Sequence, residues 1–89
     1  MTLPVKRHGV LTILDKLSAP DLLKCVQGME SLGYGSYWIP ELLGREPMAI
    51  AGYLLGNTSE INVATGIANV YARDTHATVQ ARHTLSELS

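Results

Sequence analysis

The segment with the clearest capacity for chemistry is residues 61–74, which read I-N-V-A-T-G-I-A-N-V-Y-A-R-D. It starts as a strand, because apolar residues alternate with polar ones, and it ends in the small, turn-like residues 65–69. Small side chains at the carboxyl end of a strand let the backbone approach a ligand closely. In α/β proteins that end of the strand is where ligands bind. The alternative is that Gly66 only eases the turn from strand to helix.

A second polar group follows another predicted strand. Residues 35–39, G-S-Y-W-I, are of types that favour sheets, and Pro40 cannot donate to a ladder hydrogen bond. The strand should therefore end there, which places Glu41 at its carboxyl end. We expect Glu41 to serve a ligand site, and the alternative is a solvated residue that merely follows a strand.

The remaining reactive side chains are scattered. Cys25 is the single cysteine, so no internal disulfide is possible and a reducing, cytoplasmic location is expected. It falls on the apolar side of a predicted helix, where we expect a small core residue. No Cys or His near it completes a metal-ligand spacing, so we expect no metal site. His8, His76 and His83 are not grouped, and the last two are expected at the surface of a helix.

Composition excludes several classes of function. The chain has 89 residues, is 46% hydrophobic and carries a formal net charge of −1, which fits one globular domain and gives no electrostatic reason to expect nucleic acid. No apolar run approaches the roughly 20 residues needed to span a bilayer, so no membrane segment is expected. The glycine-rich signatures of nucleotide-binding loops are also absent: L-D-K-L stands at residues 14–17, after the first predicted strand.

The elements that position these residues alternate between strand and helix. The expected strands are residues 9–14, 35–39 and 61–66, and the expected helices are residues 19–32, 47–55 and a third that starts near Asp74. The helix caps expected from sequence are Ser18 with Asp21, Gly33, Pro47 at a first turn, and Asp74. The expected apolar faces are Leu22, Cys25, Val26, Met29 and Leu32; Met48, Ala51, Gly52 and Leu55; and Ala77, Ala81, Leu85 and Leu88.

Strands that recur about every 25 residues with helices between them are typical of βαβ units and a parallel sheet. Three such units leave two open sheet edges and much apolar surface without a partner. The pattern therefore predicts either a missing remainder or self-association. Periodicity does not choose between a doubly wound sheet and a (β/α)8 barrel, although the missing nucleotide signatures disfavour the doubly wound sheet.

Three motifs, in order, resemble the luciferase-like monooxygenase family. Residues 30–41, E-S-L-G-Y-G-S-Y-W-I-P-E, are similar to its usual form E-x-L-G-Y-x-x-x-W-x-x-E. The G-R-E-P of residues 44–47, which precedes an alanine-rich helix, and the A-T-G-I-A-N-V-Y-A-R-D of residues 64–74 also resemble that family. The similarity is greatest to the branch that uses the deazaflavin coenzyme F-420, and it extends from about residue 9 to residue 89.

This resemblance implies a fold. Members of the family are (β/α)8 barrels, and residues 1–89 resemble only the amino-terminal three βα units. The expected fold is therefore α/β, with three βα units of a barrel that is incomplete in this chain. The expectation is an amino-terminal fragment, a truncated gene product or a short paralogue.

The resemblance also implies roles for individual residues. Glu41 matches an acid close to the flavin-type ring, but Leu42 stands where many members have a histidine, so a histidine acid/base role does not carry over. Gly66 and Ile67 match a non-proline cis peptide that lies against the ring. Asn69 is expected to hydrogen-bond the ring or the substrate, and Thr65 to belong to the same cofactor-binding set.

Each role has a structural alternative. Thr65 would only complete the strand ladder, and Asn69 would only cap a turn. Arg73 is expected either as an exposed residue at the start of a helix or as a contact for cofactor phosphate. Tyr37 and Trp38 are expected to pack in the core.

The function implied is an oxidoreductase that moves a hydride between coenzyme F-420 or FMN and a small organic substrate. The alternative is a non-catalytic βα module that forms homo-oligomers through its open sheet edges or complements a partial barrel. On that alternative the 89 residues alone would have little or no activity.

Overall fold

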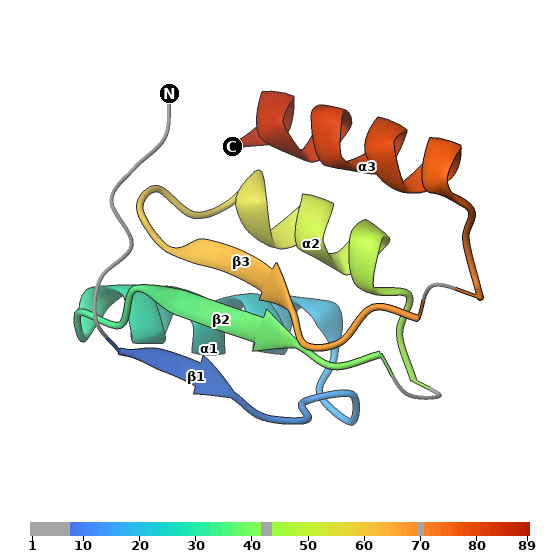
Figure 1. Ribbon diagram of the computed structural model, residues 1–89. Coiled ribbons are helices and arrows are strands. Elements are labelled where there is room, and N and C mark those ends of the chain that lie inside the picture. The colour runs from blue at the N-terminus through green and yellow to red at the C-terminus, as the bar shows by residue number, and fades with distance from the viewer. Residues whose placement is uncertain (1–7, 42–43, 70) are drawn as a thin grey trace.

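The computed structural model describes residues 8–41, 44–69 and 71–89. Strand and helix alternate three times, and the strands form one parallel sheet in the order β1-β2-β3 (Figure 1). The elements are β1 Gly9–Leu11, α1 Ala19–Ser31, β2 Ser36–Ile39, α2 Pro47–Leu55, β3 Asn62–Thr65 and α3 Thr75–Leu88. The three predicted βα units are therefore confirmed.

The helices cover one face of the sheet. Side chains alternate along a strand, so Tyr37 and Ile39 of the central strand β2 point to the same side, and both are buried. They pack with residues of α1 and α2, while α3 lies outside α2 (Figure 1). The buried core consists of Leu22, Val26, Tyr37, Ile39, Ile50, Ala51, Leu54 and Ile61.

The opposite face of the sheet is open. Parallel pairing places Leu11 beside Trp38 and Trp38 beside Ala64, so these three residues share that face. Leu11 is 65% exposed and Trp38 is 43% exposed. The prediction that Trp38 packs in the core is thus wrong, because no helix of the described residues covers the face to which it belongs, whereas the prediction for Tyr37 is confirmed.

The predicted helix caps are confirmed. The Ser18 hydroxyl accepts a hydrogen bond from the Asp21 backbone N–H at 3.2 Å, and the Asp74 carboxylate accepts one from the Ala77 N–H at 2.8 Å. Gly33 follows α1 with a φ of 92°, the left-handed conformation that glycine adopts without a steric penalty. These caps explain why helices start and stop close to the predicted residues.

In α1, two residues that were predicted to belong to the buried face are exposed. Cys25 is exposed and Leu32 is 80% exposed, although both were expected in the apolar stripe of α1. The face that meets the sheet centres on Leu22 and Val26, and each helical residue turns by about 100°, so Cys25 and Leu32 fall beyond its edge.

The second and third helices deviate for a related reason. In α2 the most deeply buried side chains include Ile50 and Leu54 rather than Met48 and Leu55, because the sheet and α1 lie on that side. In α3, only Ala81 and Leu85 of the expected face are partly buried. This helix has α2 as its main packing partner, so most of its surface stays in solvent.

The first strand is also shorter than predicted, since β1 ends at Leu11. Beyond it, Arg45 donates hydrogen bonds to the carbonyl oxygens of Leu14, at 2.9 Å, and of Leu17. These carbonyls therefore bond to a side chain from the β2–α2 connection instead of to a neighbouring strand. The basic residues Lys6 and Arg7 lie outside the described residues.

Glu30 anchors the beginning of β3 to the end of α1. Its carboxylate accepts hydrogen bonds from the backbone N–H groups of Ser59 at 3.0 Å, Glu60 at 2.5 Å and Ile61 at 2.8 Å. Burial raises the pKa of Glu30, but these backbone hydrogen bonds outweigh it and hold the pKa below its usual value. The first residue of the E-x-L-G-Y motif thus has a structural role.

We predict that Glu30→Ala lowers the free energy of unfolding by about 1–3 kcal/mol, because it leaves three backbone donors without their charged acceptor. Because the pKa of Glu30 is lowered in the folded state, its contribution is present above the unfolded pKa and is lost as the pH falls through the folded value. Urea unfolding at pH 7 and pH 3 measures both effects, with Glu87→Ala on the exposed end of α3 as control. Equal stability of the two variants at pH 7 would contradict the prediction.

Candidate functional site

The candidate site lies where the second and third strands end. Because β2 and β3 are parallel, the residues that follow them emerge at the same edge of the sheet (Figure 1). There one carboxylate oxygen of Glu41 accepts a hydrogen bond from the backbone N–H of Asn69 at 2.6 Å. Two residues separated by 28 positions, both predicted from sequence as site residues, are therefore in direct contact.

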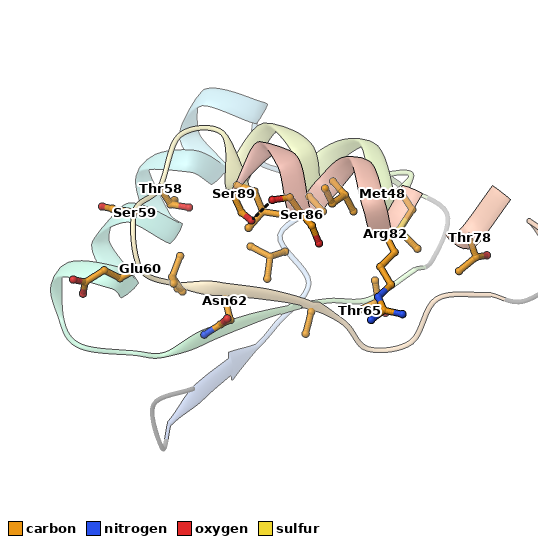
Figure 2. Close-up of a pocket in the computed structure, with 16 residues that line it drawn as sticks. Met48, Thr58, Ser59, Glu60, Asn62, Thr65, Thr78, Arg82, Ser86 and Ser89 are labelled. Carbon is orange, nitrogen blue, oxygen red and sulfur yellow. Dashed lines mark hydrogen bonds between the residues drawn. The ribbon is translucent and has the colours of Figure 1, made fainter. Parts of the chain in front are cut away.

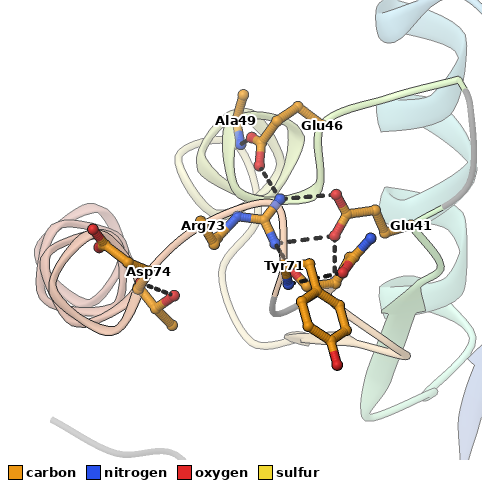
Figure 3. A network of polar contacts seen from close by, with 8 residues as sticks. Glu41, Glu46, Ala49, Tyr71, Arg73 and Asp74 are labelled. Carbon is orange, nitrogen blue, oxygen red and sulfur yellow. Dashed lines mark hydrogen bonds and ion pairs between the residues drawn. The ribbon is translucent and has the colours of Figure 1, made fainter.

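Arg73 completes this contact and extends it to a second carboxylate. Its guanidinium binds both oxygens of Glu41, at 3.0 and 2.9 Å, and one oxygen of Glu46 at 2.9 Å. Figure 3 shows Arg73 between the two glutamates. The same guanidinium donates to the backbone carbonyl of Asn69 at 3.2 Å. The side chains of Arg73 and Glu41 are only 12% and 14% exposed.

These contacts set the charge state of the cluster. Hydrogen bonds from Arg73, and then from the backbone of Asn69, outweigh partial desolvation and lower the pKa of Glu41. The pair with Glu41 in turn raises the pKa of Arg73. Glu41 is thus an ionised carboxylate with both oxygens engaged, which is suited to holding neighbouring groups in place. It is neither a solvated residue after a strand nor a free acid.

Glu46 reaches the cluster from the start of α2. One of its oxygens caps that helix by accepting from the backbone N–H of Ala49 at 2.6 Å, and the other binds Arg73. From sequence, Glu46 entered only as part of the G-R-E-P motif before the helix that starts at Pro47, with no role of its own. The available signal was its position just before a proline that starts a helix, which is where a capping side chain is found.

At the end of the third strand, the backbone of Gly66 lies close to the side chain of Trp38. The N–H of Gly66 donates to the carbonyl of Ile39 at 2.8 Å and so extends the ladder by one residue past Thr65. A Cβ atom at Gly66 would lie 3.3 Å from the ring of Trp38, so the backbone here rests almost directly on the indole. The Gly66–Ile67 peptide bond is cis, as the resemblance implied, and the Ile67 side chain is 83% exposed.

The remaining predicted residues have local structural roles as well. Thr65 pairs with Ile39 in the ladder. The side-chain oxygen of Asn69 accepts from the backbone N–H of Tyr71 at 2.9 Å, which is the turn that sequence offered as the alternative. The amide nitrogen of Asn69 makes no hydrogen bond with the described residues, so it is available to a ligand. Contact of any of these residues with a cofactor stays a prediction.

Other candidate residues do not gather here. Leu42, where a histidine was considered, lies outside the described residues. His8, His76 and His83 are exposed, which confirms the surface prediction for the two on α3. Arg73 is nearly buried rather than exposed at the start of its helix. Among the described residues no His, Cys, Asp and Glu side chains cluster so as to hold a metal ion, and no described helix is long and apolar enough to cross a membrane.

A groove lies on the helix side of β3, away from Glu41. Its walls come from β3, α2 and α3, and Arg82 extends into it from α3 (Figure 2). Arg82 makes no hydrogen bond or ion pair with any residue in the described ranges. Of the predicted site residues only Thr65 borders this groove. It is therefore distinct from the edge that carries Glu41 and Asn69.

Comparisons with known proteins identify the relatives of this chain. The family model described as luciferase-like monooxygenase matches residues 5–89. Among solved structures, the coenzyme F-420-dependent tetrahydromethanopterin reductase from Methanopyrus kandleri matches with a TM-score of 0.80 and 22% sequence identity. The match covers 92% of this chain and 24% of the reductase chain, and at this identity it shows likeness of fold. No curated protein matches the chain in sequence.

We predict that Glu41 titrates below the ordinary range of a glutamate, because its ionised form is bound by Arg73 and by a backbone N–H. Glu41 should stabilise the fold above its unfolded pKa and lose that contribution as the pH falls through the lower folded value. Carboxyl carbon shifts followed by NMR against pH measure the midpoint of Glu41, with the same carboxyl in the urea-unfolded chain as reference. Equal midpoints in the folded and the unfolded chain would contradict the ion pair.

Proposed function

Because this chain belongs to the luciferase-like monooxygenase family, we propose that it forms part of an oxidoreductase that transfers a hydride between coenzyme F-420 or FMN and a small organic substrate. The chain spans 24% of the length of the reductase chain it matches, so the activity of a whole protein is included in this proposal. The dependence of that reductase on coenzyme F-420 favours F-420 over FMN. When bound, the cofactor supplies the hydride chemistry, and the protein supplies position and polarity.

The observation that carries the proposal is the backbone at the end of β3. Gly66 presents no side chain, its Cβ position faces the Trp38 ring at 3.3 Å, and the neighbouring Ile67 is 83% exposed, so a small-residue backbone segment meets the open sheet face at this edge. A planar ring needs such a close, flat approach of backbone, so the residues present fit a flavin-type cofactor. We assign Thr65, Gly66 and Ile67 to the surface that holds the ring.

Asn69 and Glu41 supply the polar groups of this edge. The side-chain amide nitrogen of Asn69, which bonds to none of the described residues, is a donor for a ring or substrate carbonyl. Glu41 holds the Asn69 backbone in place and adds negative charge beside the site. A direct proton relay through Glu41 would require its pair with Arg73 to open, because both carboxylate oxygens are bound.

We predict that Asn69→Ala weakens cofactor binding roughly tenfold, which is the loss expected for one neutral hydrogen bond. Asn69→Ser keeps an acceptor for the Tyr71 N–H but lacks the carboxamide, and should lose nearly as much. Fluorescence titration of the full chain with oxidised F-420 and with FMN measures the dissociation constants, with His83→Ala on the exposed face of α3 as control. Absence of binding of either cofactor to the unaltered chain would overturn the proposed function.

A second candidate function is suggested by the open face of the sheet. Leu11, Ile13 and Trp38 are 65%, 60% and 43% exposed, and β1 and β3 form the two edges of the sheet. Large exposed apolar side chains on one face mark an association surface. On this reading the chain is a non-catalytic βα module that self-associates or complements a partial barrel.

This second candidate predicts a concentration-dependent oligomer. Leu11→Lys should shift the sedimentation coefficient toward that of the monomer, because a charge would have to be buried at the contact. Val79→Lys, on the exposed surface of α3, is the matched control and should leave association unchanged. A monomer that unfolds cooperatively at all concentrations would argue against the module.

A further inference from the structure

We propose that Arg73 and Glu46 are positioning residues, which fix residues 66–69 at the candidate cofactor edge by acting through Glu41. This inference rests on the proposed function for the identity of the ligand. In this proposal neither Arg73 nor Glu46 touches cofactor or substrate. Their effect reaches the backbone of Asn69 mainly through the Glu41 carboxylate, and Arg73 adds its own hydrogen bond to the Asn69 carbonyl.

The contacts form an unbroken path from the core to the site. Glu46 is attached to α2 by its cap on Ala49, and α2 contributes Ile50, Ala51 and Leu54 to the core. The second oxygen of Glu46 binds Arg73, which binds Glu41. The last link is the hydrogen bond of 2.6 Å from Asn69 to Glu41. A packed helix thereby sets the place of a segment that lies outside the sheet.

The arrangement requires the shape of arginine. One terminal nitrogen of Arg73 binds Glu41 and the Asn69 carbonyl, and the other binds Glu41 and Glu46 (Figure 3). Four acceptor contacts are thus shared by two nitrogens held in one plane. A lysine would bring one ammonium nitrogen to the same place and could preserve only part of this set. The charge alone is therefore insufficient.

The charge is nonetheless necessary, because two carboxylates converge on one cation. Oxygens of Glu41 and Glu46 both lie 2.9 Å from the same nitrogen of Arg73. Without it, two anions would remain at most about 6 Å apart, and like charges at that distance repel and raise the pKa of a carboxylate. Arg73 and Glu46 are the charged groups seen to face Glu41 in the described ranges. Loss of Arg73 should thus drive Glu41 away from the Asn69 N–H.

The same contacts argue against a direct ligand role for Arg73. An anionic group of a ligand would have to displace both glutamates from a guanidinium that is only 12% exposed. Arg82, by contrast, is exposed and makes no polar contact with the described residues. Arg82 therefore provides a control, because it is also an arginine and lies on α3, the helix that follows Arg73.

The first test follows the segment itself, in the full 89-residue chain labelled with nitrogen-15. In Arg73→Met the amide signals of residues 66–69 should shift or broaden, and the pH midpoint reported by the Asn69 amide should rise relative to that of the unaltered chain. Arg73→Lys should fall between the two, Glu46→Gln should move the same signals less, and Arg82→Met should leave them unchanged. Unchanged amide signals and an unchanged midpoint in Arg73→Met would overturn the proposal.

The second test measures binding of oxidised F-420 and of FMN to the same proteins as a function of pH. We expect Arg73→Met to weaken binding about tenfold or more and to make it fall at a higher pH than in the unaltered chain, because loss of the Arg73 hydrogen bonds removes the main cause of the lowered Glu41 pKa. Arg73→Lys should restore part of the affinity, and Arg82→Met should bind like the unaltered chain. A pH-independent loss without rescue by lysine would indicate a merely structural role and would overturn positioning.

The two proposals fail in different ways. If neither cofactor binds to the unaltered chain, the proposed function falls, whereas the amide signals still decide whether Arg73 fixes the segment. If cofactor binds equally well to Arg73→Met and Arg82→Met, the function stands and the positioning role falls. Should Arg73→Met fail to fold, Arg73→Lys and Glu46→Gln, which each keep part of the contacts, give the same decision.

Discussion

One-sided burial of the parallel sheet is the constraint on which the other features of this chain depend. The α1 and α2 helices pack against Tyr37 and Ile39, and this packing supplies nearly all of the buried core. Trp38, which lies between these two residues in β2, points to the other face of the sheet and is half exposed. Backbone polar groups in parallel strands need partner strands on both sides, and within the described part of the chain β2 alone has a strand on each side. The stabilisation from apolar burial therefore comes mainly from the single layer between the sheet and the helices α1 and α2.

Two glutamates hold the third strand at its two ends. Glu30 accepts three backbone N–H groups where β3 begins, and Glu41 accepts one just beyond its end. Glu30 lies on α1, and Glu41 lies two residues past the end of β2 and binds Asn69, four residues past the end of β3. The path of the chain before and after β3 is therefore set by charged hydrogen bonds as well as by burial. In both, interactions with N–H donors outweigh desolvation and lower the pKa of the carboxylate.

The two acids are the first and last residues of the motif at residues 30–41 that first suggested the family. Their spacing follows from the fold. One sits at the end of α1 and the other at the end of β2, so they meet opposite ends of the neighbouring strand. The motif therefore contributes to the docking of β3, and the proposed ligand site is the edge that this docking creates. This proposal does not require that Glu41 itself react.

The sequence by itself determined the order of the elements and most of their boundaries. Periodicity, caps such as Ser18 and Asp74, and glycine at Gly33 depend on local interactions that can be identified from neighbouring residues. It also located Glu41 and Asn69 at strand ends. The resemblance, rather than the pattern, indicated the cis peptide at Gly66.

Only the tertiary structure decided which helix faces are buried and how the charged residues pair. Cys25 and Trp38 were misplaced because burial depends on which side of an element meets a neighbour, and periodicity gives the existence of a face more reliably than its exact centre. The pairing of Arg73 with Glu41 and Glu46 joins residues about 30 positions apart, where no local pattern operates. Such contacts form because parallel strands bring distant loops to one edge, and that convergence exists only in the folded chain.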